Sequence, residues 1–156
     1  VLFRSSVIQV VQTVKTNTAS TTSTSLTDIT GFSLSITPSS ASNKVLVIVS
    51  VNGGVGTSSI SAIRLTRDGT TIAAGDAAGS RPVVLAGWYP GSSSVAQITT
   101  STQLFLDSPN TTSSITYQIQ WKTESGTLYL NRNSRDTNNT VDVRSISTIT
   151  AMEIEG

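Results

Sequence analysis

The amino-acid sequence predicts an all-β domain: an antiparallel two-sheet β-sandwich of jelly-roll-like form, with about nine or ten strands and almost no helix. Apolar residues alternate with polar ones in nearly every apolar stretch, which places them on one face of a strand. Serine and threonine make up about a third of the chain and fit solvated strand faces and turns. No long segment carries apolar residues at helical spacing. Strands without helical crossovers pair antiparallel, and two such sheets stack.

The first half of the chain alternates strand patterns with turn clusters. The predicted strands there are residues 7–14, 32–37, 45–51, 60–66 and 70–74. Residues 45–51 are apolar on both faces, so we expect them to form a central strand. Asp68 and Gly69, set between two alternating segments, are typical of a hairpin turn. The Ser/Thr tract at residues 16–25 is either a loop or a strand with both faces in water.

The second half repeats this organisation. Its predicted strands are residues 83–89, 95–106, 115–121, 127–130 and 141–154. Residues 75–82 and 131–140 are expected to be loops, since the first consists mainly of small residues and the second of polar ones. Trp121 lies in phase with other apolar residues of its strand, so we expect it in the core.

No linker divides the chain, so residues 6–156 are predicted to form a single β-sandwich domain. Residues 1–5 differ in character from the rest of the chain, which lacks an initiator methionine. We therefore expect residues 1–5 to be a cloning or assembly scar, with the natural chain continuing towards the N-terminus.

Composition excludes several classes of function. The chain contains no histidine and no cysteine, which removes the usual general base, disulfides and sulfur-bound metals, so we expect no enzyme, no metal site and no cofactor. Charged residues are 12% of the chain and the net charge is +1, which argues against nucleic acid as a partner. No apolar run is long enough for membrane insertion. A hydrolase with two carboxylates in one cleft stays open as a third class.

Five residues are the candidates for binding a glycan. Trp88 and Tyr89 precede a Pro-Gly pair at a strand end, where an aromatic ring can be exposed to stack on a sugar. Asn131, Arg132 and Arg135 lie in a polar loop whose amides and guanidinium groups can bond hydroxyls. The same loop lacks the carboxylate spacing of a calcium loop. A solvated connecting loop without a ligand is the alternative.

Several short segments of the sequence resemble a β-rich domain found in tail-fibre and other structural proteins of marine phages, especially cyanophages. The matching segments are distributed over nearly the whole chain from Ser6 and comprise residues 6–16, 35–40, 44–47, 75–81, 105–112, 129–132 and 147–154. The resemblance carries no established catalytic residues. It implies a non-catalytic module of a virion, located in an extracellular appendage.

Phage fibres are usually trimeric, so the resemblance also implies a homotrimer, packed through aliphatic strands on the outer face of the sandwich. Copies presented together gain avidity for a host-surface glycan. The alternative function is a carbohydrate-binding β-sandwich module of a secreted bacterial protein.

Overall fold

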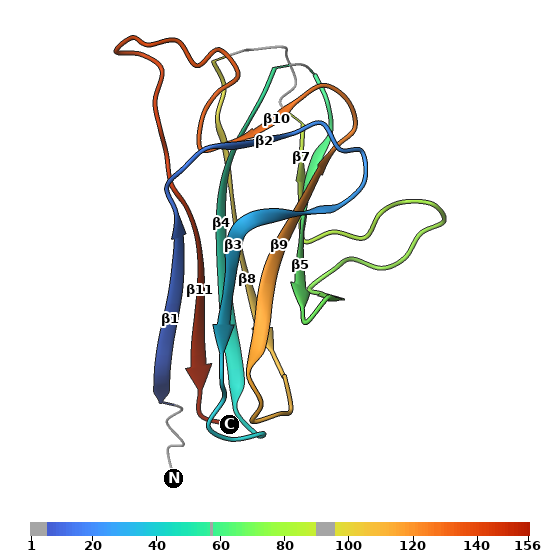
Figure 1. Cartoon of the computed structure of the whole chain (residues 1–156). Coiled ribbons are helices and arrows are strands. Elements are labelled where there is room, and N and C mark those ends of the chain that lie inside the picture. The colour runs from blue at the N-terminus through green and yellow to red at the C-terminus, as the bar shows by residue number, and fades with distance from the viewer. Residues whose placement is uncertain (1–5, 57, 90–95) are drawn as a thin grey trace.

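A computed structural model describes residues 6–56, 58–89 and 96–156, where the backbone forms eleven strands and no helix (Figure 1). The strands are β1 (Val7–Lys15), β2 (Ala19–Thr21), β3 (Thr27–Ile36), β4 (Lys44–Val55), β5 (Ser61–Arg67), β6 (Thr70–Ile72), β7 (Ala86–Trp88), β8 (Thr99–Asp107), β9 (Ile115–Thr123), β10 (Leu128–Leu130) and β11 (Ser147–Ile154). The predicted all-β sandwich of antiparallel strands is confirmed. Residues 1–5, the expected scar, lie outside the described residues.

The strand boundaries differ from the sequence prediction where alternation is a poor guide. The short strand β2 lies inside the Ser/Thr tract, where Ala19 is its only apolar residue and no apolar alternation marks a buried face. The last predicted strand is shorter than expected, because β11 begins at Ser147 and residues 141–146 belong to a loop. Strand β7 likewise covers only the end of the predicted strand at residues 83–89.

Sheet A contains six strands built around β4. One edge of β4 pairs with β11 and then, further along, with β10, while the other edge pairs with β8. Strand β1 continues the sheet beyond β11, and β2 continues it beyond β10. The central position predicted for residues 45–51 is confirmed, and it explains why side chains on both faces of this strand are apolar.

Sheet B contains five strands, with β3, β9 and β5 side by side and the short strands β6 and β7 both paired with β5. The predicted hairpin joins β5 and β6. Asp68 and Gly69 have φ angles of 48° and 80°, which is the backbone that a tight two-residue hairpin needs. The chain crosses repeatedly between the sheets, so most neighbours within a sheet are distant in sequence.

The core lies between the sheets and consists of the inward side chains of alternating strands. The largest fully buried apolar side chains include Phe32, Ile63, Leu65 and Ile119. Trp121 is buried among them, as the sequence predicts.

Two carboxylates are buried at the margins of this core. Asp107 ends β8 and receives a hydrogen bond of 2.7 Å from the Tyr117 hydroxyl and two from Arg67. Burial and the Asp107 carboxylate raise the pKa of Tyr117 well above its ordinary value. The Arg67 guanidinium therefore compensates a charge that the apolar interior would otherwise exclude.

Glu153 is the second buried carboxylate and ties β11 to its surroundings. It accepts hydrogen bonds from Gln9 on β1, from the backbone and hydroxyl of Ser39, and from Asn43, at 2.6 to 2.8 Å. Burial alone would raise the pKa of Glu153, but the hydrogen bonds from Asn43, Gln9 and Ser39 outweigh it and lower the pKa to about 2. The ionised form thus stabilises the folded chain.

Candidate functional site

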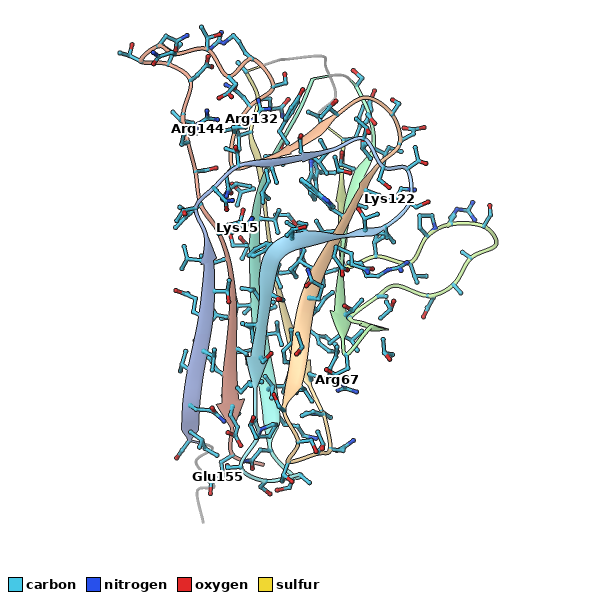
Figure 2. The ribbon with its side chains drawn as sticks, in the orientation of Figure 1. Lys15, Arg67, Lys122, Arg132, Arg144 and Glu155 are labelled. Atoms are coloured by element: carbon cyan, nitrogen blue, oxygen red, sulfur yellow. The ribbon has the colours of Figure 1, made fainter. Side chains whose placement is uncertain are left out.

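The polar loop at residues 131–146 projects from one end of the sandwich, beyond β10 and β11 (Figure 1). Arg132 and Arg144 lie together at this end, while Glu155 lies near the opposite end (Figure 2). An antiparallel bridge joins Arg132 to Arg144 at the base of the loop. The loop is therefore closed at its base by backbone pairing.

Asn131, a predicted glycan contact, is a structural anchor in this loop. Its side chain is fully buried, donates to the carbonyls of Lys15 and Asn17 at 2.7 and 3.1 Å, and accepts from the Ser147 hydroxyl. Its φ of 60° is one that asparagine tolerates. These bonds join the ends of β1, β10 and β11 and leave no part of the side chain on the surface for a sugar.

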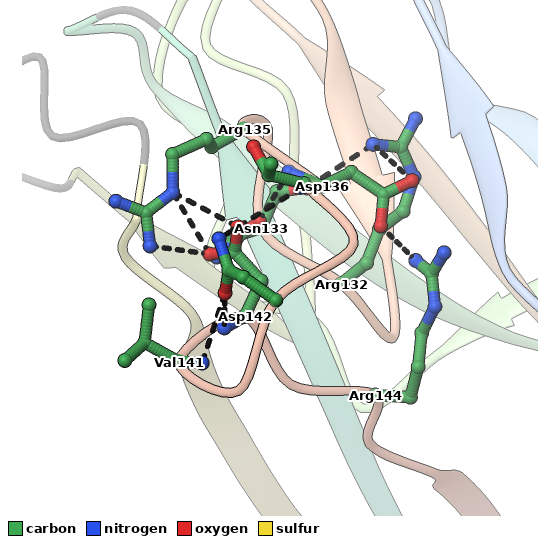
Figure 3. A network of polar contacts seen from close by, with 9 residues as sticks. Arg132, Asn133, Arg135, Asp136, Val141, Asp142 and Arg144 are labelled. Carbon is green, nitrogen blue, oxygen red and sulfur yellow. Dashed lines mark hydrogen bonds and ion pairs between the residues drawn. The ribbon is translucent and has the colours of Figure 1, made fainter.

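Arg135 is held by a carboxylate at the centre of the loop. Its guanidinium donates three hydrogen bonds of 2.6 to 2.9 Å to Asp142, which is also bonded by Asn133, the Thr137 backbone and Asn139 (Figure 3). The hydrogen bonds from Arg135, with those from Asn133 and Thr137, hold the pKa of Asp142 well below its ordinary range. Asp142 thus organises the loop as a fixed anion.

Arg132 is held from two sides. Its guanidinium lies 4.0 Å from the centroid of the Tyr129 ring and 3.3 Å from the carboxylate of Asp136, which also pairs with Arg144. Cation–π stacking and the ion pair orient the planar guanidinium. Both arginines that the sequence selects therefore brace the loop.

A polar hollow of about 290 Å³ opens in the outer part of the loop. The residues that line it are Asp136, Thr137, Asn138, Asn139, Asp142 and Arg144. Sequence reasoning missed Arg144, Asn138 and Asn139 as candidates, because polar residues in a polar loop give no periodic signal. The hollow is lined by two carboxylates, of which Asp142 is the one whose pKa the surrounding hydrogen bonds lower.

The aromatic candidate Trp88 lies apart from the loop that holds the arginines. Trp88 packs partly buried against the core, and a Cβ added to Gly53 would come within 2.9 Å of its ring. A Cβ added to the next residue, Gly54, would instead come within 2.9 Å of the Asn133 Cα and meet the Arg132 carbonyl. Successive residues of a strand face opposite sides of the sheet. The ring and the loop therefore lie on opposite faces of β4.

Tyr89 differs from Trp88 in exposure. It follows β7, and 56% of its surface is exposed, which leaves the ring accessible. The structure thus brings together Arg132 and Arg135 within one loop, buries Asn131 beneath it, and separates both from the ring of Trp88.

The outer face of sheet A is the second candidate site. Where β1, β11, β4 and β8 lie side by side, the outward side chains form four rows, and more of these side chains are aliphatic than polar. We call this surface the aliphatic face, and its apolar members are Val7, Val10, Val14, Leu46, Ile48, Leu104, Leu106, Met152 and Ile154. The polar residues of the same rows are Gln12, Lys44, Ser50, Thr102, Thr148 and Thr150.

One row crosses all four strands without a polar side chain: Val10, Met152, Leu46 and Leu106 are successive neighbours. The exposed fractions are 56% for Val10, 54% for Leu106 and 63% for Leu104 in the next row. Single exposed aliphatic residues are ordinary, but a contiguous group marks a contact surface.

The described parts of the chain contain neither a cluster of potential metal ligands nor a membrane-spanning helix. Residues 6–56, 58–89 and 96–156 contain no group of three or more acidic, histidine or cysteine residues that could hold a metal ion. In the same ranges, no helix is long and apolar enough to cross a membrane.

Comparison with known proteins finds a distant structural likeness. No protein-family model matches the sequence, and no curated protein matches it. A chain in the solved structure of infectious bursal disease virus, Gx strain, is similar over 97% of this chain, with 15% sequence identity and a TM-score of 0.41. This chain spans only 40% of the length of that viral chain. A likeness at this level supports no conclusion about function.

Proposed function

We propose that this chain is a non-catalytic structural module of a virion, of the tail-fibre kind, which assembles with copies of itself in an extracellular appendage. The observation that carries the proposal is the aliphatic face of sheet A, where exposed aliphatic side chains from four neighbouring strands form one surface. The sequence resemblance to marine phage structural proteins supplies the virion setting.

Self-assembly fits the chemistry of this face. Its outward side chains between Val10 and Val14, and between Leu46 and Ser50, carry no charge, so a strongly charged partner gains nothing there. A second copy presents the same apolar surface and can bury it. A homotrimer is the assembly that we propose.

Light scattering on the purified chain at micromolar concentration tests the assembly. We expect three times the mass of one chain, and a monomer mass would overturn the proposal. Sequencing the genome around the coding region tests the setting. Tail, baseplate or capsid genes on either side are expected, whereas glycoside hydrolase domains in the same reading frame would favour the secreted carbohydrate-binding module.

Glycan binding is a second role that one observation favours, namely the polar hollow in the loop at residues 131–146. Arg144 at its rim has a half-exposed guanidinium, and Asn138 is exposed beside it. Such groups form directional bonds with sugar hydroxyls. We propose that this hollow, with Arg132 and Arg135 behind it, forms the attachment site.

A glycan array tests this role with the whole chain and the variant Arg144→Ala. Arg81→Ala is the matched control, because Arg81 is exposed in a different loop and bonds only to Ala78 among the described contacts. We expect Arg144→Ala to lose binding and Arg81→Ala to retain it. No binding by the native chain, or equal binding by both variants, would remove the glycan role and leave the structural one.

A further inference from the structure

We propose that the free edge of β8 in one copy pairs with the free edge of β1 in the next, so that three sheets close into a triangular prism around the aliphatic faces. The inference rests on the self-assembly proposed above and names the contact that directs it.

The two edges are open and unprotected in the described part of the chain. Among those residues, strand β1 pairs only with β11, and β8 pairs only with β4. Both are nine residues long, β8 is regular throughout, and β1 is regular from Gln9 onward. Their only charged residues, Lys15 and Asp107, stand at the strand ends with buried side chains. Long regular edges without exposed charge, proline or a central bulge are templates for pairing with another chain.

Sheet B shows that this chain does protect edges elsewhere. The edge strand β3 is interrupted by a register shift between Asp28 and Ser33, with Gly31 at a φ of 70°, and Asp28 is exposed. The opposite edge is divided into β6 and β7, of three residues each. Bulges, charges and short edge strands all discourage pairing. The two long edges of sheet A carry fewer of these features, because β1 has a register shift only near its start, between Val7 and Gln9, and β8 has none.

Strand direction permits the pairing. Strand β1 is antiparallel to β11, β11 to β4, and β4 to β8, so β1 and β8 run in opposite directions. A threefold rotation about an axis along the strands preserves each strand's direction. The β8 of one copy therefore meets the β1 of the next as an antiparallel neighbour, and the alternation continues around the ring.

The width of the sheet selects three copies. Four strands at about 4.8 Å spacing are about 19 Å wide. Three such sheets arranged as a triangle lie about 5.5 Å from the common axis, which matches half of the roughly 10 Å that separates packed sheets. One layer of side chains then fills the centre. Four sheets in a square would lie about 9.5 Å from the axis and leave it hollow.

The corners of this prism hold four exposed apolar side chains of the aliphatic face. Leu104 and Leu106 point outward from β8, and Val10 and Val14 point outward from β1. Pairing β8 with β1 of the next copy places these two groups beside each other. A twofold pairing of β8 with β8 would also be antiparallel, but it would leave both β1 edges and both aliphatic faces open.

Disulfide trapping tests this contact, since the chain has no cysteine of its own. Val14→Cys is combined in turn with Thr100→Cys, Thr102→Cys or Leu104→Cys, which samples three registers across the corner. Mild oxidation of one of the double variants is expected to give closed covalent trimers on a non-reducing gel. Each single variant is the control and is expected to give no covalent species, because a β1 cysteine faces only β8.

The outcomes separate the edge pairing from the assembly itself. Covalent dimers from the single Thr102→Cys or Leu104→Cys variant would show that like edges pair, and would overturn the inference. A native trimer by light scattering without cross-links in any double variant would overturn the edge pairing and leave the proposed assembly standing. A monomer would overturn both.

Discussion

The two sheets of this sandwich are alike on their inner faces and unlike on their outer ones. Inward positions of both are filled by buried aliphatic and aromatic residues. Outward positions of sheet B carry charges and amides, including Arg64, Gln120 and Lys122, while those of sheet A form the aliphatic face. Because both inner faces satisfy the same core, this difference cannot be a demand of folding. It indicates that the outer face of sheet A is a contact surface and that of sheet B is not.

Their edges differ in the same direction. Sheet B is bounded by a bulged strand and by two strands of three residues, whereas the four-stranded part of sheet A is bounded by two regular strands of nine residues. The loop at residues 131–146, at one end of sheet A, is braced internally by Asp142 and Asp136. Four variants test this contrast.

The largest effect is expected from placing charge on the aliphatic face. The double variant Leu104→Lys with Leu106→Lys should weaken self-association by at least about 100-fold, because each ammonium would be buried without a partner. Sedimentation equilibrium measures the change. Ser35→Lys with Gln120→Lys, on the outer face of sheet B, is the matched control and should leave the assembly intact. Equal losses of self-association in both variants would show that the two outer faces do not differ as contact surfaces.

Glu153→Gln should lower the free energy of unfolding by about 2–3 kcal/mol, since hydrogen bonds to a buried carboxylate are lost or weakened. Glu153 lies on the inner side of β11, behind the aliphatic face, and links β11 to β1 through Gln9. Urea denaturation at pH 7 measures the effect. An unchanged midpoint would show that this margin of sheet A is held by packing alone.

The same residue predicts a pH dependence. The pKa of Glu153 is about 2 in the folded chain and near 4.5 when unperturbed, so its contribution is complete above pH 5 or so and is lost as pH falls towards 2. Thermal melts between pH 7 and pH 2 should show a steeper decline for the native chain than for Glu153→Gln. Parallel declines would contradict the ionised state of Glu153.

Gly54→Ala should cost about 1–3 kcal/mol, because the added methyl would press against backbone atoms of Arg132 and Asn133. Gly75→Ala is the control, since an added Cβ there meets nothing within 4 Å. Chemical denaturation compares the two. A neutral Gly54→Ala would mean that the base of the loop is free to move away from β4.

The smallest effect is expected from Asp142→Asn. Losing the anion frees Arg135 and loosens the loop, so amide exchange at Thr137 should accelerate while the assembly stays unchanged. The pKa of Asp142 is held well below its ordinary range, so the native loop should stay braced until strongly acidic pH. Hydrogen exchange at pH 7 and pH 4 checks both points. Loss of the trimer in this variant would connect the loop to the aliphatic face.

Sequence reasoning recovered the fold well because alternation reports directly on which side of a strand is buried. Residues 45–51 are apolar on both faces, which identified the central strand, and Asp68-Gly69 identified the hairpin. It left the tract that contains β2 open between a loop and a strand, because these three small residues show no alternation of their own and are held by pairing with β10. Nor did it separate residues 141–146 from β11, since valines of a loop and of a strand look alike.

The candidate site was predicted less completely. The sequence selected the correct loop, but Asn131 proved to be buried, and Trp88 lies on the other face of β4 from Arg132. Neither outcome is visible in local composition. The residues around an asparagine in the sequence do not show whether its side chain anchors three strands or faces solvent.

The sequence alone determined that this chain is an all-β sandwich with a hydroxyl-rich surface and without histidine or cysteine chemistry, because composition and period-two alternation are local properties. Only the tertiary structure decided which alternating strands share one sheet, and therefore that Val10, Met152, Leu46 and Leu106 form a single row. These residues lie far apart in the chain and become one surface through strand pairing. The aliphatic face depends on the register in which the strands pair, and that register cannot be read from the sequence of any single strand.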